Sequence, residues 1–292
     1  MKQIAIIGST ASGKTALSIE MAQKANAIIL SLDSLSVYKE IDIASAKPTV
    51  EERAGITHFG IDEVYPNEKF DVVEFLTCYE RAKDYALKNN KNLIIVGGTG
   101  FYLKILIEGI SKGVGEDVVL DKPLDEIHAL LFKLDETHME KIASNDTYRI
   151  TKAYSIYKKS GLTPTNYFKA NPPTPIAPDL ELFEIVWDRE ELRERISLRT
   201  NIMINEGIID EVIYLEKKYG RKPNAMSSIG IAETLLYLDG RLNKKELQEK
   251  ISTNTARLAK RQSTFNRNQF NGRQTSNIIK NLNSDILKYF SI

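Results

Sequence analysis

Short apolar runs alternate with helical patterns along the first hundred residues of the chain. Three runs bounded by turn residues predict strands at 3–7, 27–31 and 93–96, and 56–64 is a candidate for a further short strand. Between the runs, apolar residues recur at the spacing of one helix face, as at 75–87. Strands that alternate with helices in this way predict an α/β fold with a parallel sheet covered on both faces.

The pattern changes beyond residue 109, where helical stretches follow one another without a strand. These stretches lie at about 123–143 and 146–160, and four prolines then stiffen 172–178. A further strand is predicted at 182–187, followed by helices at 190–206, 207–219, 228–238 and 243–265. We therefore expect a catalytic core with a helical insertion domain, divided as 1–112 with 179–292 and 113–178.

The first strand runs into a glycine-rich loop of the kind found in nucleotide-binding proteins. The loop follows a strand and precedes a helix, as the pattern G-x-x-x-x-G-K-[ST] requires. Successive backbone N–H groups point at phosphate oxygens, and the helix adds the positive end of its dipole. Lys14 neutralises charge, and the Thr15 hydroxyl is placed to hold Mg²⁺. The predicted phosphate-binding residues are Gly8, Thr10, Ala11, Ser12, Gly13, Lys14 and Thr15.

The acid that follows a strand is in an unusual place. In motor ATPases and GTPases an apolar strand ends in an Asp that helps to bind Mg²⁺, whereas the strand at 93–96 ends in glycines and a threonine. Asp33 comes after the second strand instead. Ligands bind beyond the carboxyl ends of parallel strands, so we expect Gly8, Asp33 and Thr99 around one crevice. There Asp33 binds metal or takes a proton; the alternative is a helix N-cap.

Composition narrows the class of protein. One cysteine among 292 residues excludes an intramolecular disulfide framework, and three scattered histidines lack the spacing of a zinc site. No apolar run is long enough to cross a bilayer, and the N-terminus lacks the layout of a signal peptide. We therefore expect a cytoplasmic protein without a membrane partner, and a monomer.

Positive charge is concentrated in one segment, although the formal net charge of the chain is only +1. Residues 250–280 contain no Asp or Glu and carry Lys250, Arg257, Lys260, Arg261, Arg267, Arg273 and Lys280. An acid-free basic segment of this length favours contact with a phosphate backbone. The alternative is a solvated basic helix.

With these residues assembled, the chain resembles the bacterial tRNA dimethylallyltransferase (isopentenyltransferase) family from residue 4 to about 267, most weakly at 113–143. The resemblance rests on the order and spacing of short segments, of which only the phosphate loop is specific alone. The segments are Gly8–Thr15, Asp33-Ser34, Val37-Tyr38, Asp42-Ile43, Ala46-Lys47-Pro48, Val96–Gly100, Tyr102-Leu103, Asn145-Asp146, Arg149, Asp188-Arg189, Arg195-Ile196, Arg199, Glu206-Gly207, Glu211-Val212, Ile229-Gly230, Glu233, Thr255–Arg257 and Ala259–Gln262.

The resemblance implies a reaction and a set of site residues. A P-loop NTPase-like core would transfer a dimethylallyl group from dimethylallyl diphosphate, with Mg²⁺, to N6 of the adenosine 3′ of the tRNA anticodon, releasing diphosphate. Asp33 would be the general base, while Thr99 and Arg199 would line the channel near the diphosphate. The insertion would grip the anticodon stem-loop. The implied tRNA contacts are Asp33, Ser34, Leu35, Ser36, Thr99, Tyr148, Arg149, Lys152, Lys260 and Arg261.

The chain also departs from the family pattern. Ser36 stands where Gln is common, and the other departures are Ala44-Ser45 for Gly-Thr, Phe59 for a second His, and Phe265-Asn266-Arg267 for Trp-Phe-Arg. Only Ser36 touches the implied chemistry, because the family Gln contacts the target base. A hydroxyl offers one short rotatable contact, so we expect adenine discrimination to rest more on the channel walls and the shape of the RNA loop.

Two other functions use the same residues. A kinase of a nucleoside or small molecule would bind ATP at the loop, and transfer of the γ-phosphoryl group to a small molecule would identify it. A non-catalytic NTP-gated RNA-binding protein would use the loop and the basic segment for binding alone. Nucleotide-dependent retention of RNA without product would identify that protein.

Overall fold

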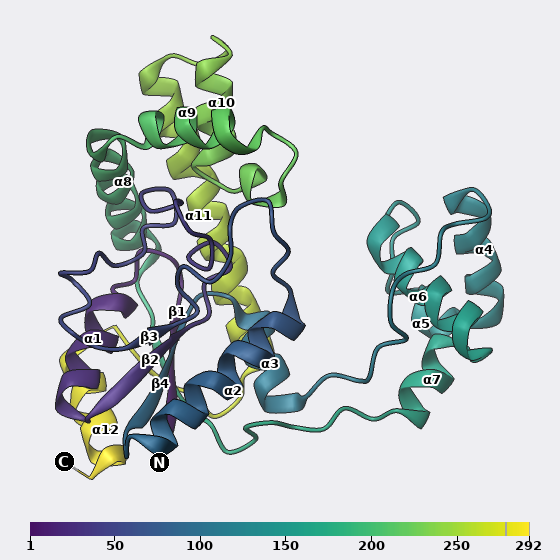
Figure 1. Cartoon of the computed structure of the whole chain (residues 1–292), viewed down its shortest axis with the longest axis horizontal. Coiled ribbons are helices and arrows are strands. Elements are labelled where there is room, and N and C mark those ends of the chain that lie inside the picture. Colours follow the sequence, from purple (N-terminus) through teal and green to yellow (C-terminus); the bar gives the residue numbers. More distant parts are fainter. Residues whose placement is uncertain (278, 292) are drawn as a thin grey trace. The chain divides into compact units, whose positions relative to one another are not determined.

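The computed structural model describes residues 1–277 and 279–291, which divide into two compact units. The first unit comprises Met1–Leu103 with Asp179–Ile292, and the second comprises Lys104–Pro178. Helix α3 (Gly100–Glu108) begins in the first unit and continues into the second (Figure 1). The chain therefore passes from one unit to the other within a helix.

A six-stranded parallel sheet forms the centre of the first unit (Figure 1). Its strands are β1 (Gln3–Gly8), β2 (Ala27–Ser31), β3 (His58–Phe59), β4 (Asn92–Gly97), β5 (Glu181–Ile185) and β6 (Gln274–Ser276), in the spatial order β3-β2-β4-β1-β5-β6. β1 pairs with both β4 and β5, and β1 and β4 are apolar almost throughout because both of their faces are buried. The predicted α/β fold with a parallel sheet is confirmed.

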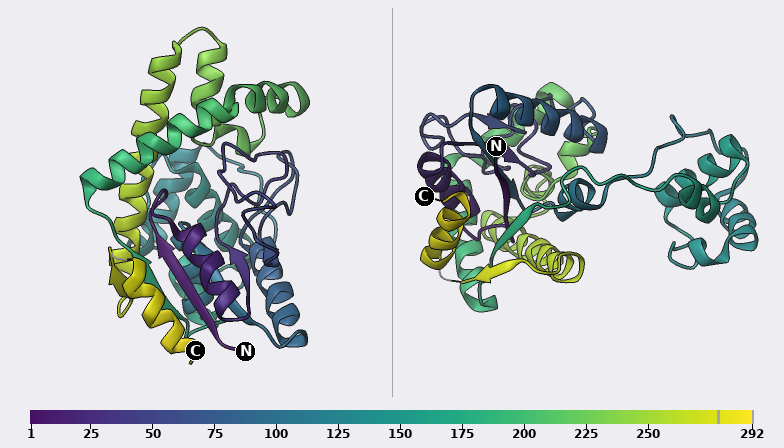
Figure 2. Two further views of the ribbon diagram at one scale, coloured as in Figure 1. Left: turned by 90° about the vertical axis from the view of Figure 1, so that its left-hand side faces the viewer. Right: turned by 90° about the horizontal axis from the view of Figure 1, so that it is seen from below.

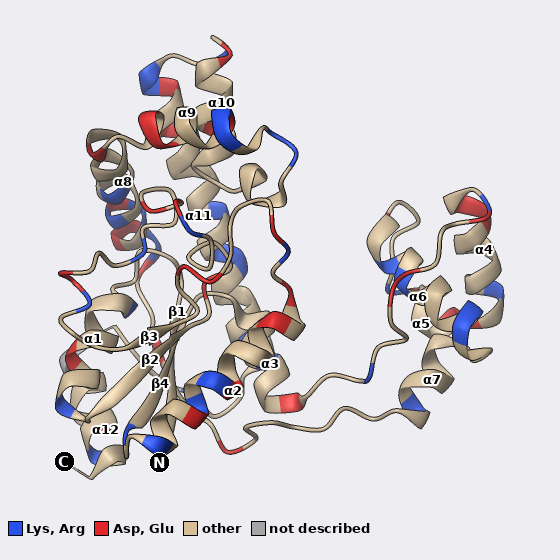
Figure 3. Ribbon diagram, in the orientation of Figure 1, with Lys and Arg blue, Asp and Glu red and all other residues tan. Residues whose placement is uncertain are grey.

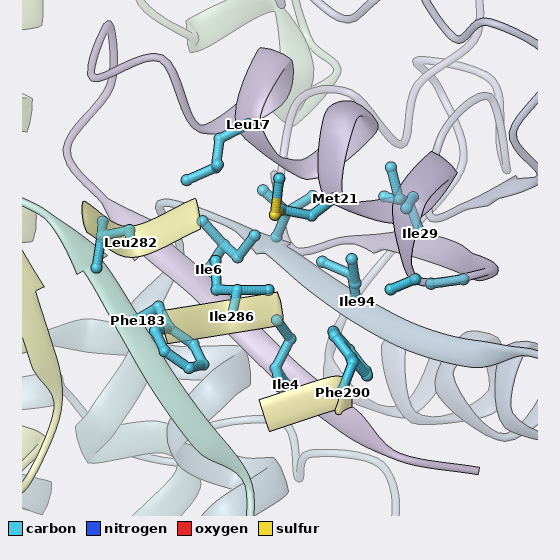
Figure 4. Close-up of a cluster of buried hydrophobic side chains, with 14 of the residues drawn as sticks. Ile4, Ile6, Leu17, Met21, Ile29, Ile94, Phe183, Leu282, Ile286 and Phe290 are labelled. Carbon is cyan, nitrogen blue, oxygen red and sulfur yellow. The ribbon is translucent and has the colours of Figure 1, made fainter. Parts of the chain in front are cut away.

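Helices cover both faces of this sheet. On one face α1 (Lys14–Lys24) packs against α12 (Ile279–Phe290), and Figure 2 shows the two side by side. The other face is covered by α2 (Val72–Lys88), which contacts β2 and β4, and by α11 (Lys244–Gln269), which contacts β1. The core beneath α1 and α12 is drawn in Figure 4; it includes Ile4, Ile6, Ile29, Ile94 and Phe183 of the strands, Leu17 and Met21 of α1, and Leu282, Ile286 and Phe290 of α12.

A second group of helices lies beyond the carboxyl ends of the strands (Figure 1). It contains α8 (Arg189–Glu206), α9 (Ile208–Tyr219), a short 3-10 helix η1 (Asn224–Ser227), α10 (Ile231–Leu238) and the first part of α11. Gly207, in the left-handed region at φ 100°, ends α8. Apolar residues of α8, α9 and α10 pack against the segment after β2, notably Val37, Tyr38 and Ile41. The segment that carries Asp33 is thus anchored at its far end.

The second unit is helical and has its own small core. Its helices are α4 (Leu124–Leu134), α5 (Glu136–Met139), α6 (Thr147–Ser160) and α7 (Pro164–Ala170), packed around Ile127, Leu131, Met139, Ile150 and Tyr154. The single helical stretch expected at 123–143 is divided at Asp135, whose carboxylate accepts from the His138 and Thr165 backbone N–H groups. The non-helical backbone of Asp135, at φ −152°, ends α4, and its side chain caps the start of α5.

The elements predicted from the sequence do not include α7, β6 or α12. In the part of the chain described, none of the helices has the length and apolar character needed to cross a bilayer. Elements from the last twenty residues of the described chain complete the core of the first unit, because α12 covers the part of the sheet face that α1 does not cover.

Candidate active site

The loop between β1 and α1 has the backbone shape that phosphate binding requires. Gly8, Gly13 and Ala11 all have positive φ, at 148°, 94° and 63°. A Cβ on Gly8 would lie 2.7 Å from the carbonyl oxygen of Ile185. Both this lack of space and the positive φ therefore favour glycine at the first position of the loop. α1 begins at Lys14, which places the positive end of its dipole at the loop.

Three side chains from distant elements hold the backbone of this loop. The Thr10 N–H donates to Gln262 Oε1 at 2.8 Å, Arg195 Nε donates to Ala11 O at 2.8 Å, and Trp187 Nε1 donates to Ser12 O at 2.9 Å. The Arg195 guanidinium also stacks over the Trp187 ring, 4.5 Å from its centroid. The sequence gives one signal for Arg195: it precedes Arg199 by four residues, on the same face of α8. No such signal marks Trp187.

Two cations flank the loop on its concave side. Arg199 Nη1 lies 3.3 Å from Thr10 Oγ1. Burial and the neighbouring Arg199 lower the pKa of Lys14 to about 8, against the opposing effect of Asp33 and Glu184. Burial also lowers the pKa of Arg199. Two like charges in partly buried positions are costly without a counter-charge, so the loop is suited to a multiply charged anion.

Two adjoining cavities meet at this loop. The larger, of about 460 Å³, has predicted site residues on its walls: Thr10, Asp33, Ser34, Leu35, Thr99, Arg199 and Arg261. Apolar side chains complete it, among them Ile196, Met203, Leu258 and Phe265. The smaller, of about 80 Å³, is lined by Lys14, Thr15 and Ser36 and shares Thr10, Asp33 and Arg199 with the larger. The structure thus brings the loop and both predicted strand-end residues, Asp33 and Thr99, around one crevice.

The end of β4 is close to α11. A Cβ on Gly98 would overlap the Gln262 side chain. The glycines after β4, where motor ATPases have an acid, therefore allow α11 to approach the sheet and place Gln262 against the loop. Gln262 lines both cavities.

Asp33 caps a turn rather than a helix. Its Oδ1 accepts hydrogen bonds from the backbone N–H groups of Leu35 (2.8 Å) and Ser36 (3.1 Å). The residues that follow form turns, so the helix N-cap alternative is wrong. Both bonds use the same oxygen, and they fix the carboxylate where the two cavities meet.

The segment after this turn is held by a half-buried acid and a buried lysine. Glu211 of α9 accepts three backbone N–H bonds, from Asp42 (2.8 Å), Ile43 (2.7 Å) and Ala44 (2.9 Å). Lys47 Nζ forms an ion pair with Asp42 at 2.6 Å and another with Asp62. These contacts explain the family segments at 42–48 and 211–212: their residues hold the chain after β2 in place.

Three predicted tRNA contacts lie at the start of α6 in the second unit. Tyr148 is 70% exposed. Lys152 Nζ lies 5.6 Å from the centroid of the Tyr148 ring and 2.9 Å from Asp117 Oδ2. Arg149 Nε lies 3.5 Å from Asp146 Oδ2. The three side chains therefore form one exposed aromatic and basic cluster.

The basic segment is divided among different surfaces. Lys260 and Arg261 are adjacent on α11 and share one hollow, but only Arg261 also lines the 460 Å³ cavity, whereas Lys260 also lines a cavity between α8 and α11. Arg273 forms an ion pair with buried Glu184, which also accepts from Asn266 Nδ2 at 2.9 Å. Arg273 is therefore not part of a cationic surface, contrary to the count of charges along the sequence.

The strand–loop–helix unit and the parallel sheet behind it define an α/β protein of the P-loop class. Residues 36–269 match the protein-family model described as IPP transferase, and the chain belongs to this family. It is 67% identical, over the full length of both chains, to a tRNA dimethylallyltransferase of Aliarcobacter butzleri (strain RM4018). It is 54% identical to the protein of the same name from Sulfurovum sp. (strain NBC37-1), covering 99% of this chain and 97% of that one.

Solved structures give the same result. The tRNA isopentenylpyrophosphate transferase of Staphylococcus epidermidis superposes with a TM-score of 0.70 at 29% identity, covering 100% of this chain and 99% of the other. A eukaryotic dimethylallyltransferase, described as acting on tRNA, superposes with a TM-score of 0.81 at 28% identity, covering 91% of this chain and 70% of the other. The family resemblance drawn from the sequence is confirmed.

Proposed function

We propose that this chain transfers a dimethylallyl group from dimethylallyl diphosphate to N6 of the adenosine immediately 3′ of the anticodon in tRNA. The observation that carries the proposal is the junction of two cavities at Thr10, Asp33 and Arg199. One cavity is small and faces the phosphate loop, and the other has apolar walls and a volume suited to a prenyl group with a purine.

The loop and its cations would stabilise the departing diphosphate. The allylic C–O bond breaks with its electron pair on the diphosphate oxygen, so negative charge grows there as the prenyl carbon becomes positive. Lys14, Arg199 and the loop N–H groups would meet that charge with donors already in place. The apolar walls, including Met203 and Leu258, would enclose the prenyl group and exclude water.

The residues fit a Mg²⁺ ion held jointly with the substrate. Among residues 1–277 and 279–291, no three His, Cys, Asp or Glu side chains are grouped to hold a metal. Mg²⁺ commonly keeps several waters and takes substrate phosphate oxygens with only one or two protein ligands. The Thr15 hydroxyl, at the start of α1, would be such a ligand. When bound, the ion supplies further neutralisation of the leaving group.

Asp33 would accept the proton that the N6 amine loses as the new N–C bond forms. Because Oδ1 already accepts two backbone bonds, Oδ2 would take this proton. The target base must leave its stack to reach the cavity, and Thr99 would line the opening that receives it. A single-stranded loop lowers the cost of that step.

The remaining predicted contacts would hold the RNA. Ser34, Leu35 and Arg261 line the 460 Å³ cavity and would contact the nucleotides entering it. In the second unit, Tyr148, Arg149 and Lys152 would contact the anticodon stem-loop, with Lys152 available to exchange its Asp117 partner for a phosphate.

The experiment that tests this function is mass analysis of tRNA nucleosides after incubation with dimethylallyl diphosphate, Mg²⁺ and the protein. We expect one adenosine to gain a dimethylallyl group and ATP to remain unhydrolysed, because β4 ends without an acid. Phosphorylation of a small molecule by γ-labelled ATP would support the kinase instead. Nucleotide-dependent RNA retention without product would support a binding protein.

Replacing Ser36 by Ala should have a small effect on this reaction. Ser36 is 5% exposed and lines the 80 Å³ cavity beside Lys14 and Thr15. We expect Ser36→Ala to lose about 0.5–1.5 kcal/mol of transition-state stabilisation, the net scale of one hydrogen bond. The measurement is kcat/KM of wild type and variant on one tRNA. A loss as large as that of an Asp33 variant would show that Ser36 performs the role of the family Gln.

A further inference from the structure

A second large cavity lies between α8 and α11 and is separate from the reaction site. Its volume is about 810 Å³, and we call it the α8–α11 groove. Five cations line it: Arg189 and Arg193 of α8, and Arg257, Lys260 and Arg267 of α11. Ile196 lines both this groove and the 460 Å³ cavity, so the two adjoin across the seam between the helices.

The charge of the groove is uncompensated. No carboxylate lines it, although α8 carries Glu190, Glu191 and Glu194 on other parts of its surface. Within residues 1–277 and 279–291, none of the five groove cations forms an ion pair with Asp or Glu. Figure 3 shows Lys and Arg positions on both helices in blue. Uncompensated cations in one concave surface favour a polyanion.

The cations continue from the groove to the 460 Å³ cavity. Arg257, Lys260 and Arg261 together line a shallow hollow of about 620 Å³ on the outer face of α11. Arg261 also lines the 460 Å³ cavity, while the other two line the groove. From Arg257 to Arg267 the helix rises about 15 Å. One extended anion can therefore contact the mouth of the reaction site and the groove at once.

The lining favours phosphates over bases. The groove reaches Trp187, whose ring would be the stacking surface for a base. The Arg195 guanidinium lies over that ring, and the indole N–H is bound to Ser12 O. Hydroxyl groups of Ser263 and Thr264 stand among the cations instead. Cations with neighbouring hydroxyl donors are the usual contacts of a sugar–phosphate backbone.

We propose that the α8–α11 groove binds the sugar–phosphate backbone of the RNA strand that flanks the target nucleotide, so that Arg189 and Arg193 of α8 contact RNA as well as α11. The inference rests on the proposed function, because it takes the substrate to be RNA. The target base would enter beside Arg261, and the adjoining backbone would cross the outer face of α11 into the groove.

The first test measures tRNA affinity against salt for the full chain and for the double variant Arg193→Gln/Arg267→Gln. Both side chains are exposed, so the fold should be retained. Each lost phosphate contact on a single strand should flatten the slope of log affinity against log salt by about 0.7, or roughly 1.4 for the pair. KM for tRNA should rise, while kcat and KM for dimethylallyl diphosphate should stay near wild type.

The matched control is Lys217→Gln, which removes an exposed cation from α9 outside the groove and should leave the slope unchanged. An unchanged slope in the double variant, with normal kcat and KM, would overturn the inference. If wild type binds tRNA with a slope that the double variant flattens, yet forms no prenylated adenosine, the proposed function fails and the groove stands.

The second test locates the RNA. Burial raises the pKa of the lone native thiol, Cys78, to about 11, so a thiol introduced by Arg193→Cys should react selectively with a photo-crosslinking reagent. We expect adducts on nucleotides flanking the target adenosine, as with Arg261→Cys as the positive control. Adducts from Arg261→Cys alone would overturn the groove assignment.

Discussion

Asp33→Asn should lower kcat on tRNA by about 10²–10⁴, the usual contribution of a positioned general base, while tRNA affinity changes far less. The amide oxygen of Asn accepts hydrogen bonds as the carboxylate does, so the backbone bonds from Leu35 and Ser36 survive. What is lost is the capacity to take a proton from N6. The measurement is single-turnover prenyl transfer together with the Kd for tRNA.

The comparison with Asp33→Ala separates the two parts that Asp33 plays. Alanine removes the proton acceptor and the turn cap together. The Asp33→Ala variant should therefore have as low a kcat as Asp33→Asn and should also be less stable to heat. Near-normal turnover in Asp33→Asn, with a defect only in Asp33→Ala, would reduce Asp33 to a turn cap and refute its assignment as the base.

Lys14→Ala should lower kcat/KM for dimethylallyl diphosphate by about 10²–10³, the scale of one preorganised charge-stabilising group. The ammonium lies beside Arg199 on the concave side of the loop, where the leaving group would gain charge. Steady-state kinetics with varied donor would measure the loss. Unchanged donor kinetics would mean that the diphosphate binds away from the loop.

The acidity of Lys14 adds a pH signature to this prediction. Burial and Arg199 hold the pKa of the free Lys14 ammonium at about 8, so its charge is lost as pH rises through that value. The substrate phosphates are already ionised there. Affinity for dimethylallyl diphosphate should therefore fall above pH 8, by up to about tenfold per pH unit. Lys14→Ala should bind weakly and with no such dependence between pH 7 and 9.5.

Much of the fold could be predicted because its signals are local. β1, β2 and β4 are apolar runs between turn residues, β5 carries three apolar residues among its five, and the phosphate loop is a contiguous pattern. β6 could not be predicted from periodicity, since Gln274–Ser276 is polar and is a strand only because it pairs with β5. α12 repeats Leu282, Ile286 and Phe290 at a helical spacing, a signal present in the sequence but missed.

The candidate site also has parts that the sequence predicts and parts that it does not. Asp33 and Thr99 follow strand ends, and topology alone gathers such residues at one edge of a parallel sheet. The contacts of Gln262 with Thr10 and of Trp187 with Ser12 join residues 252 and 175 positions apart, so no local pattern reveals them. The charge count likewise could not show that Glu184, 89 residues before Arg273, neutralises that side chain.

The discontinuous first unit has a consequence for the order in which this protein can fold during synthesis. The second unit, Lys104–Pro178, is one uninterrupted stretch and can close its core as soon as that stretch is free of the ribosome. The packing of β1 is completed later. Its neighbour β5 is synthesised some 175 residues after it, and α12, which covers the same face as α1, is synthesised later still. Until then the apolar strands β1, β2 and β4 lack their full cover. Such high sequence separation predicts slow completion of the sheet, so the phosphate loop, although synthesised well before β5 and α12, is among the last segments of this unit to be fully supported.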